Sequence, residues 1–140
     1  MYQTRGKFST GTARYQSVDL SSRLEGATPH QLVHVMYEEL LKALDAMAFA
    51  TARGDYVQRG EHQSKVLAIL TGLETSLDFE KGGEIATGLV VIYREARRLV
   101  IAAGRDGDAA LVTKAREIIQ EISSAWDAIG QQGQGHATGF

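Results

Sequence analysis

The sequence predicts an all-α protein, specifically an antiparallel up-down-up-down four-helix bundle with an N-terminal docking segment. Four successive segments carry apolar residues at spacings of three and four, which is typical of amphipathic helices. Short connections with glycine or aspartate separate these segments, and no segment shows the alternation of a half-buried strand. Helices of about twenty residues joined by short connections pack as antiparallel neighbours.

The first helix has the clearest start in the chain. Thr28 is placed to cap it, Pro29 stands at the first helical position, and Gln31 completes a capping box. Gly54 is expected to end it. Two adjacent apolar stripes follow: Leu32, Met36, Leu40, Ala43 and Met47, and Val33, Tyr37, Leu41, Leu44 and Ala48.

The second helix is expected to begin after Asp55, a capping residue with Gln58 three positions later, and to run to about Leu77. Its apolar positions are Val66, Ile69, Leu70, Leu73 and Leu77. The glycine pair Gly82-Gly83 then reads as the joint to the third helix, because glycine allows the positive φ that a chain reversal needs. A phosphate-binding loop would require a preceding strand and a lysine and hydroxyl at set spacing, which are missing here.

The third helix is expected to follow the glycine pair and to end at Gly104, and Asp106 or Asp108 is expected to cap the fourth, which runs to Ile129. The predicted core stripe of the third helix comprises Ile85, Leu89, Ile92, Ala96, Leu99 and Ala103. That of the fourth comprises Leu111, Ala115, Ile118, Ile122, Ala125 and Ile129, with Ile119 and Trp126 beside it.

Composition narrows the function classes. A chain of 140 residues suits one domain, and a net charge of -2 argues against a general nucleic-acid binder. The absence of cysteine excludes disulfides, thiolate metal sites and a cysteine nucleophile. No apolar run approaches the roughly 20 residues that cross a bilayer, and the N-terminus has no signal-peptide pattern. We therefore expect a soluble protein that begins near Met1 and does not insert into membranes.

The two flanks differ from the predicted bundle of residues 26–129. Residues 1–25 are polar and basic but include spaced apolar side chains, which favours a segment that docks conditionally. Residues 130–140 are rich in glycine and glutamine and are expected to be disordered.

A search for chemistry finds no catalytic, metal or cofactor site. The Glu-x-x-His pairs of di-iron bundles are absent, as is any nucleophile motif. His30, His34 and Glu38 share one helix face and could in principle hold zinc, but a solvated polar face is the expected reading. Arg94, Arg97 and Arg98 are expected to pair with nearby carboxylates, the sharper alternative being an acidic contact on a partner. The protein is therefore expected not to be an enzyme.

The apolar faces are wider than a four-helix core needs. Such a surplus can mean a homodimer, or a groove for a peptide. Trp126 is most simply a core residue, although tryptophan is also a common interface anchor.

Several of these segments resemble the FliS family of flagellar export chaperones. The resemblance rests on "ATPHQLVHVMYEELLKAL", "ARGDYVQRGEHQSKVLAILTGL", "LDFEKGGEIATGLVVIY" and "SSAWDAI", and it covers about Met1 to Ile129 in register. The central "EKGGEIAT" is the most specific of the four. The glycine pair therefore carries a family signature.

The resemblance implies a cytoplasmic chaperone that binds newly made flagellin at its disordered C-terminal segment. Binding prevents premature polymerisation and brings flagellin to the export gate of the flagellar type III secretion system, without ATP or metal. The N-terminal segment would cover part of the apolar surface until the client displaces it. Tyr15 matches a family tyrosine implicated in docking to the gate, and Tyr93 and Trp126 match family positions in the third and fourth helices.

These considerations define two predicted sites. The predicted flagellin-binding groove comprises Met36, Leu40, Leu70, Leu73, Leu77, Leu89, Ile92, Tyr93, Ile119 and Trp126. The predicted lid and gate-docking segment uses Phe8, Tyr15, Val18 and Leu20. The predicted partners are flagellin and an export-gate component, with the chain itself a monomer or weak homodimer. The alternative is a structural, homodimeric helical bundle without a flagellin client.

Overall fold

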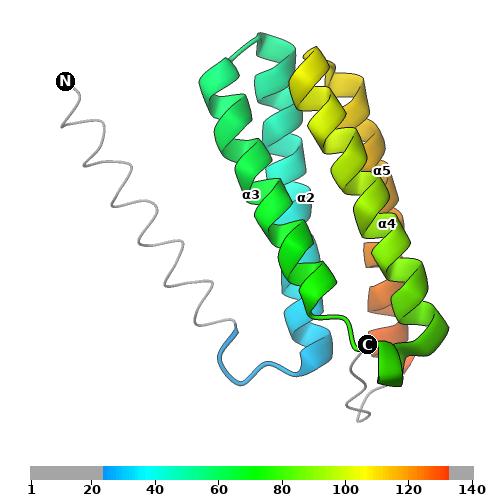
Figure 1. The fold of residues 1–140 in the computed structure, drawn as a ribbon. Coiled ribbons are helices and arrows are strands. Elements are labelled where there is room, and N and C mark those ends of the chain that lie inside the picture. The colour runs from blue at the N-terminus through cyan, green and yellow to red at the C-terminus, as the bar shows by residue number, and fades with distance from the viewer. Residues whose placement is uncertain (1–23, 133–140) are drawn as a thin grey trace.

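Four helices form the bundle in a computed structural model of the chain, which describes residues 24–132. The helices are α2 (Pro29–Arg53), α3 (Tyr56–Thr75), α4 (Phe79–Asp106) and α5 (Ala109–Gln132). They run alternately up and down (Figure 1), and α2 and α4 each pack against both α3 and α5. Because these residues contain no strand, the predicted fold class is confirmed. Phe8, Tyr15, Val18 and Leu20 lie outside the described residues, as does most of the 130–140 tail, so the lid and the tail stay predictions.

The predicted caps of the first two helices are confirmed. The Gln31 backbone N–H donates to Thr28 Oγ1 at 3.1 Å, and the Thr28 N–H donates to Gln31 Oε1 at 2.9 Å. Gly54 adopts the left-handed conformation just beyond α2, with φ 72°. Asp55 then caps α3 by accepting a hydrogen bond from the Gln58 N–H at 3.1 Å. These local signals fix where the first two antiparallel helices begin.

The joint between α3 and α4 lies earlier than the sequence pattern indicated. Asp78 caps α4 by accepting hydrogen bonds from the N–H groups of Glu80 and Lys81, so the connection is residues 76–78. The glycine pair instead lies inside α4, where Gly83 has φ 49° and ψ -124° and kinks the helix. The positive φ expected at this pair is confirmed, and the long part of the helix does follow the pair, but the connection between α3 and α4 lies at residues 76–78, one short turn earlier. Figure 1 shows the first turn of α4 angled away from the rest of the helix.

The end of α4 also differs from the prediction. The helix continues through Gly104 and ends at Asp106, with Gly107 in the left-handed conformation at φ 66°. A Cβ at Gly104 would meet the terminal amide of the Gln63 side chain of α3, a flexible group that would have to turn away. Asp108 caps α5 through the Ala110 N–H at 2.9 Å. Of the two predicted caps, Asp108 is therefore the one used.

The buried stripe of α5 is rotated from the predicted one. Its core residues are Val112, Ala115, Ile119 and Trp126. Leu111, Ile118 and Ile122 only pack half-buried against that core. The sequence shows a wide apolar face, but the centre of that face depends on where α2 and α4 lie around α5, which one helix cannot specify.

Candidate functional site

The ten predicted groove residues divide into two groups by burial. Five are at most 1% exposed and belong to the core cluster, and Trp126 is 5% exposed; the five are Leu40, Leu70, Leu73, Tyr93 and Ile119. Four are half-buried: Met36, Leu77, Leu89 and Ile92. A partner could touch the half-buried group directly, whereas contact with the first group would require the helices to move. The groove as a whole stays a prediction.

Tyr93 is held inside the bundle by a second tyrosine. Its hydroxyl lies 2.7 Å from that of Tyr37 in a buried hydrogen bond between α4 and α2. Burial is the main cause that raises the pKa of each phenol above its ordinary value of 10.0, so the folded chain holds both protons further into the alkaline range than a free phenol does. The pair satisfies two polar groups that would otherwise be buried without a partner.

Trp126 joins the end of α5 to the start of α2. Its ring stacks on that of His30, with centroids 4.4 Å apart and planes 5° apart, and meets Tyr37 edge-on at 6.3 Å. Its indole N–H donates to the His30 carbonyl oxygen at 3.0 Å. This arrangement supports the core reading of Trp126.

The polar face of α2 contacts α5 through the side chain of His34. His34 bridges two carboxylates, with Nε2 2.5 Å from Glu38 and Nδ1 2.6 Å from Asp127 of α5. His30 faces Trp126, so the three residues of the zinc hypothesis do not converge. Within residues 24–132, no group of three His, Asp or Glu side chains comes together as a metal site requires.

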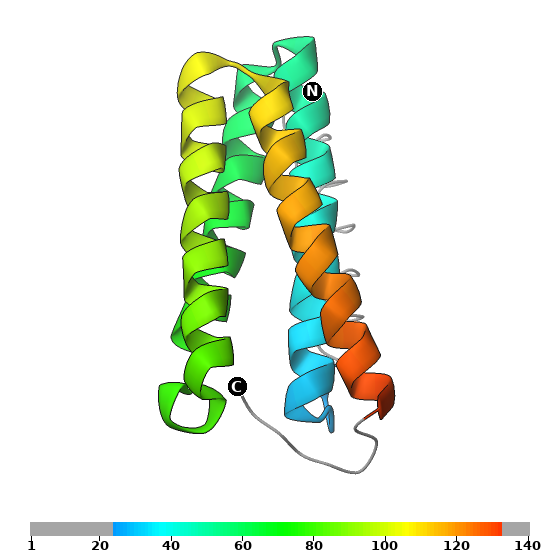
Figure 2. The same cartoon turned by 90° about the vertical axis from the view of Figure 1, so that its right-hand side faces the viewer.

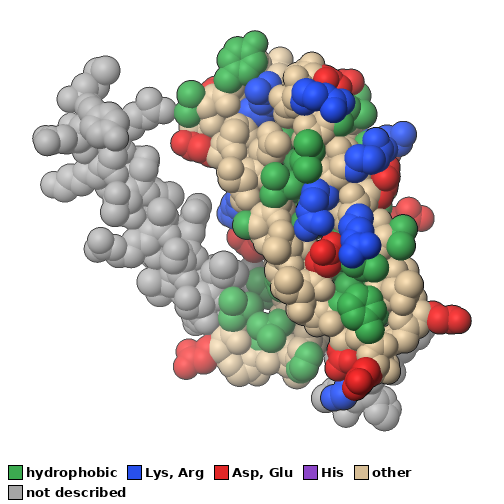
Figure 3. Space-filling model, viewed as in Figure 1, with side chains coloured by type: hydrophobic (Ala, Val, Ile, Leu, Met, Phe, Trp, Pro, Cys, Tyr) green, Lys and Arg blue, Asp and Glu red, His purple; other side chains and the backbone are tan. Residues whose placement is uncertain are grey.

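Exposed apolar side chains gather at one end of the bundle. This is the end where α2 and α4 begin and α3 and α5 finish, and we call it the open end: the exposed Leu32, Phe79, Ile85 and Ile129 with the half-buried Leu77 and Leu89. Phe79 is 53% exposed and Ile85 48% exposed, whereas Ile119 in the core is fully buried. Figure 3 shows hydrophobic side chains on the surface in the lower part of the view, where this end lies.

The arrangement of the helices accounts for this exposure. α4 and α5 are joined closely through Gly107 and Asp108, and they diverge toward the open end (Figure 2). Side chains on diverging helices cover one another less, so their apolar atoms remain in contact with water. An amphipathic segment from another chain could cover them.

The opposite end also exposes apolar residues, but arginines partly cover them. The Arg53 guanidinium lies 4.4 Å from the centre of the Phe49 ring, and that of Arg59 lies 4.9 Å from the Tyr56 ring. Such cation–π contacts occupy the ring faces. Even so, Phe49, Tyr56 and Val57 remain 63%, 71% and 69% exposed, so it is the divergence of α4 and α5 that marks the open end as the candidate binding surface.

The sequence pattern missed the two most exposed members of the open end as binding residues. The pattern gives Phe79 no role and places Ile85 in the core stripe of its helix. The available signal was the glycine pair between them, since the kink at Gly83 turns the first part of α4 away from the helix axis. That signal could not be used without knowing that both glycines lie inside the helix.

Two comparisons with known proteins complete the description. The sequence model of the family described as "Flagellar protein FliS" matches residues 11–133. The flagellar secretion chaperone FliS of Salmonella typhimurium is 34% identical over 122 residues, which cover 86% of this chain and 90% of the relative. The namesake from Vibrio cholerae is 32% identical, over 82% of this chain and 85% of its own length. FliSB of Pseudomonas aeruginosa, also named a flagellar secretion chaperone, is 28% identical, over 83% and 92%.

Proposed function

We propose, from the premise that this chain belongs to the FliS family of flagellar secretion chaperones, that it binds the disordered C-terminal segment of flagellin. Binding in the cytoplasm would keep flagellin from polymerising early, and the complex would then pass to the flagellar type III export gate. No helix within residues 24–132 is both long and apolar enough to span a membrane. The proposed role is binding rather than catalysis.

The exposed apolar residues of the open end carry the proposal. A disordered client that folds on binding loses several kcal/mol in ordering, so its partner must offer a preformed apolar surface. Leu32, Phe79, Ile85 and Ile129 supply such a surface without any rearrangement of the bundle. Amphipathic helices bind surfaces of this kind with apolar residues at spacings of three and four. The half-buried Met36, Leu77, Leu89 and Ile92 would extend the contact toward the core.

The N-terminal segment, residues 1–25, is proposed to compete with the client. Phe8, Tyr15, Val18 and Leu20 are spaced apolar residues that could cover the open end before flagellin arrives. Deleting residues 1–20 should tighten flagellin binding, because a competing segment is removed, and should weaken export if Tyr15 also docks on the gate. Weaker flagellin binding by the truncated chain would contradict a competing lid.

Calorimetry of the full chain with a peptide of the flagellin C-terminal segment tests the proposal. We expect one peptide per chain and a clear heat signal at micromolar concentration. The variants Phe79→Ser and Ile85→Ser should each weaken binding about tenfold, as loss of an exposed apolar anchor does. The controls are Phe49→Ser and Val57→Ser, which remove apolar residues at the other end that are even more exposed than Phe79 and Ile85.

Three outcomes would count against parts of the proposal. No binding signal at micromolar concentration would contradict a flagellin client. Self-association in light scattering that flagellin does not disrupt would favour the alternative, a homodimeric bundle. Equal losses in both pairs of variants would leave the client in place but move its binding surface away from the open end.

A further inference from the structure

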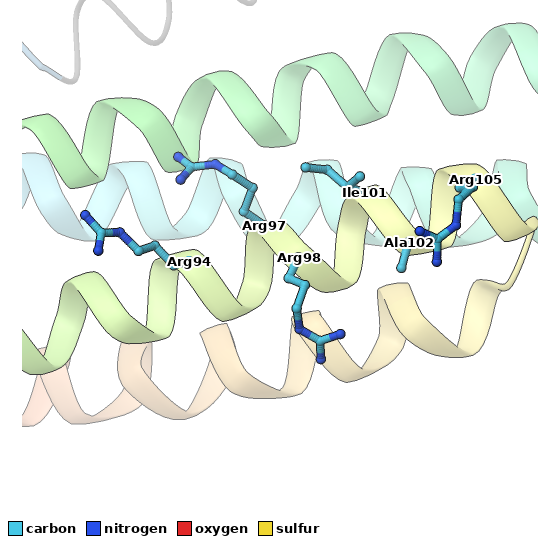
Figure 4. A pocket seen from close by; sticks show the side chains of 6 residues that line it. All are labelled: Arg94, Arg97, Arg98, Ile101, Ala102 and Arg105. Carbon is cyan, nitrogen blue, oxygen red and sulfur yellow. The ribbon is translucent and has the colours of Figure 1, made fainter.

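A row of arginines follows the outer surface of α4, away from the open end. Arg94, Arg97, Arg98 and Arg105 surround a surface hollow of about 380 Å³, which Ile101 and Ala102 also line (Figure 4). Arg97 and Ile101 point toward α3 and Arg98 points toward α5, so the hollow spans the exposed side of the helix. Figure 3 shows basic side chains aligned along α4 with hydrophobic ones between them.

The carboxylates around this row do not match its positive charge. Glu74 serves two arginines, with Oε1 3.2 Å from Arg97 Nη1 and 3.6 Å from Arg94 Nε. Arg98 pairs with Glu95, and Arg105 pairs with its neighbour Asp106. Lys114 of α5 also acts on Glu95, where the arginine and the lysine both lower the pKa of the carboxyl group. Five cations therefore face three carboxylates in a chain whose net charge is -2.

Within residues 24–132, protein groups accept hydrogen bonds from only a minority of the N–H donors in this row. A guanidinium carries five N–H donors, and Arg98 and Arg105 each spend two of them on their carboxylates. Arg94 makes only a loose ion pair, at 3.6 Å. Exposed ion pairs of this kind contribute about 0–1 kcal/mol, so a partner's carboxylates could replace or join them at little cost.

An apolar residue lies among these charges. Ile101 is 46% exposed between Arg98 and Arg105, a position where a purely electrostatic surface would carry another polar residue. The row therefore offers charge at its two ends and an apolar contact in the middle. The spacing from Arg94 through Arg98 and Ile101 to Arg105 follows one helical face, about 16 Å long at a rise of 1.5 Å per residue.

We propose that this row is a second docking surface, which binds an acidic amphipathic helix of a partner protein. The partner's carboxylates would bind Arg94, Arg98 and Arg105, and one apolar side chain would rest on Ile101. Planar guanidinium groups bind carboxylates through paired hydrogen bonds, which gives such a contact direction as well as charge. The surface would act independently of flagellin, since it lies on a different part of the molecule from the open end.

A nucleic acid fits the same row less well. The carboxylates of Glu74, Glu95 and Asp106 lie within it and would repel a continuous phosphate backbone. Nucleic-acid-binding domains are commonly basic as a whole, whereas this chain is slightly acidic. Discrete carboxylates on a helix can avoid those three positions, and a helix can also supply the apolar side chain that Ile101 would contact.

A designed peptide measures the fit directly. An alanine-based helical peptide carries glutamate at the spacing of Arg94, Arg97, Arg98 and Arg105, and leucine at the position of Ile101. Fluorescence anisotropy with the full chain should show saturable binding that weakens as salt rises from about 50 to about 500 mM, because screening shortens the range of the charges. A peptide of the same composition with its glutamates scattered around the helix should bind at least about tenfold more weakly, since its charges no longer share one face.

Matched variants locate the binding. The triple variant Arg94→Glu, Arg98→Glu, Arg105→Glu should no longer bind the peptide. If charge reversal disturbs the fold, the corresponding triple glutamine variant, which removes the charges without reversing them, should bind the peptide more weakly than the wild type. The control variant Lys42→Glu, Lys65→Glu, Arg116→Glu has the same net charge and should keep the peptide, because its exposed cations lie on α2, α3 and α5. Flagellin affinity should be unchanged in both, which separates this proposal from the flagellin proposal.

The natural partner is identified by crosslinking in the native cell. A photoreactive residue replaces Ala102, and the crosslinked peptides are sequenced. Segments rich in aspartate and glutamate, lost in the triple arginine variant, would support the proposal. Crosslinks to nucleic acid or to segments without acidic residues, or no crosslink at all, would overturn it, as would equal peptide binding by the two triple variants or a loss of flagellin binding in the arginine variant.

Discussion

The hydroxyl groups of Tyr37 and Tyr93 lie 2.7 Å apart at the centre of the bundle. They join α2 to α4, the diagonal pair of helices, whose other contacts are few compared with those between neighbouring helices. The apolar side chains around them have no preferred direction, whereas a hydrogen bond is satisfied only when the two hydroxyls are level. The pair therefore fixes how far α2 and α4 can slide relative to each other.

Removing both hydroxyls should cost less than the sum of the losses from removing each one alone. Tyr37→Phe or Tyr93→Phe leaves the remaining hydroxyl buried without its partner, which should lower the free energy of unfolding by about 1–3 kcal/mol. The double variant loses both polar groups and should be less destabilised than the sum of the single variants. Urea denaturation of the four proteins gives this coupling energy. Strictly additive losses would show that each hydroxyl finds another partner.

The same pair predicts a loss of stability at alkaline pH. Burial raises the pKa of both phenols in the folded state above the ordinary value of 10.0. The two phenols contribute fully to the free energy of unfolding below pH 10. That contribution falls as pH rises above 10, because the unfolded chain then releases these protons while the folded chain retains them. The free energy of unfolding should fall by about 1.4 kcal/mol per pH unit for each phenol that is ionised only in the unfolded chain. Urea denaturation across that range should show the decline in the wild type and a smaller one in the double phenylalanine variant.

More of the fold than of the candidate site could be predicted from the sequence. Caps and stop signals such as Thr28, Asp55 and Gly54 act within a few residues, so the sequence places them correctly. Gly104 and the glycine pair look like stop signals too, but α4 is capped by Asp78 before the pair and continues through Gly104 to Asp106. Local pattern alone cannot distinguish a glycine that ends a helix from one that lies inside it.

The burial of the predicted groove residues could not be predicted for the same reason: it depends on how neighbouring helices pack. An apolar residue such as Leu73 or Phe79 fits either a core or a binding surface by composition. The structure buries the first and exposes the second, because the helices pack closely along their length and diverge at one end. Which apolar positions remain open is a property of the assembled bundle.

Trp126 offers a test that separates a core role from a binding role. Its ring is 5% exposed, stacks on His30 and donates to the His30 carbonyl, so Trp126→Ala should cost roughly 3–5 kcal/mol of stability. Trp126→Phe keeps an aromatic ring and loses the indole N–H, which should cost about 1 kcal/mol from that hydrogen bond. Urea denaturation measures both. A small loss of stability with a large loss of flagellin affinity would instead place the ring in the binding surface.

Gly130 controls the same contact from the end of α5. A Cβ at this position would meet the His30 ring, so Gly130→Ala should push that ring away from Trp126 and cost about 1–3 kcal/mol. Because Trp126 is the only tryptophan, its fluorescence emission should change with the displacement. The control is Gly60→Ala in α3, where a Cβ meets nothing within 4 Å and should stabilise the helix by about 0.5–1 kcal/mol. Unchanged emission in the Gly130 variant would mean that α5 shifts instead of His30.

The kink at Gly83 gives the last prediction, which concerns backbone conformation alone. A Cβ at Gly83 would meet nothing within 4 Å, but its φ of 49° and ψ of -124° are unfavourable for an L-residue. Gly83→Ala should therefore cost about 1–3 kcal/mol, while Gly88→Ala in the same helix, with open space and no positive φ, should be stabilising.

A D-alanine at position 83, introduced by peptide ligation, isolates the cause. For a D-residue the same backbone angles mirror an ordinary extended conformation, so this variant should keep or exceed the wild-type stability. Because the kink sets the direction of the turn that carries Phe79, we expect L-alanine to weaken flagellin binding and D-alanine to preserve it. Equal stability of the L- and D-alanine proteins in urea would mean that α4 straightens without cost and that the kink is not imposed by Gly83.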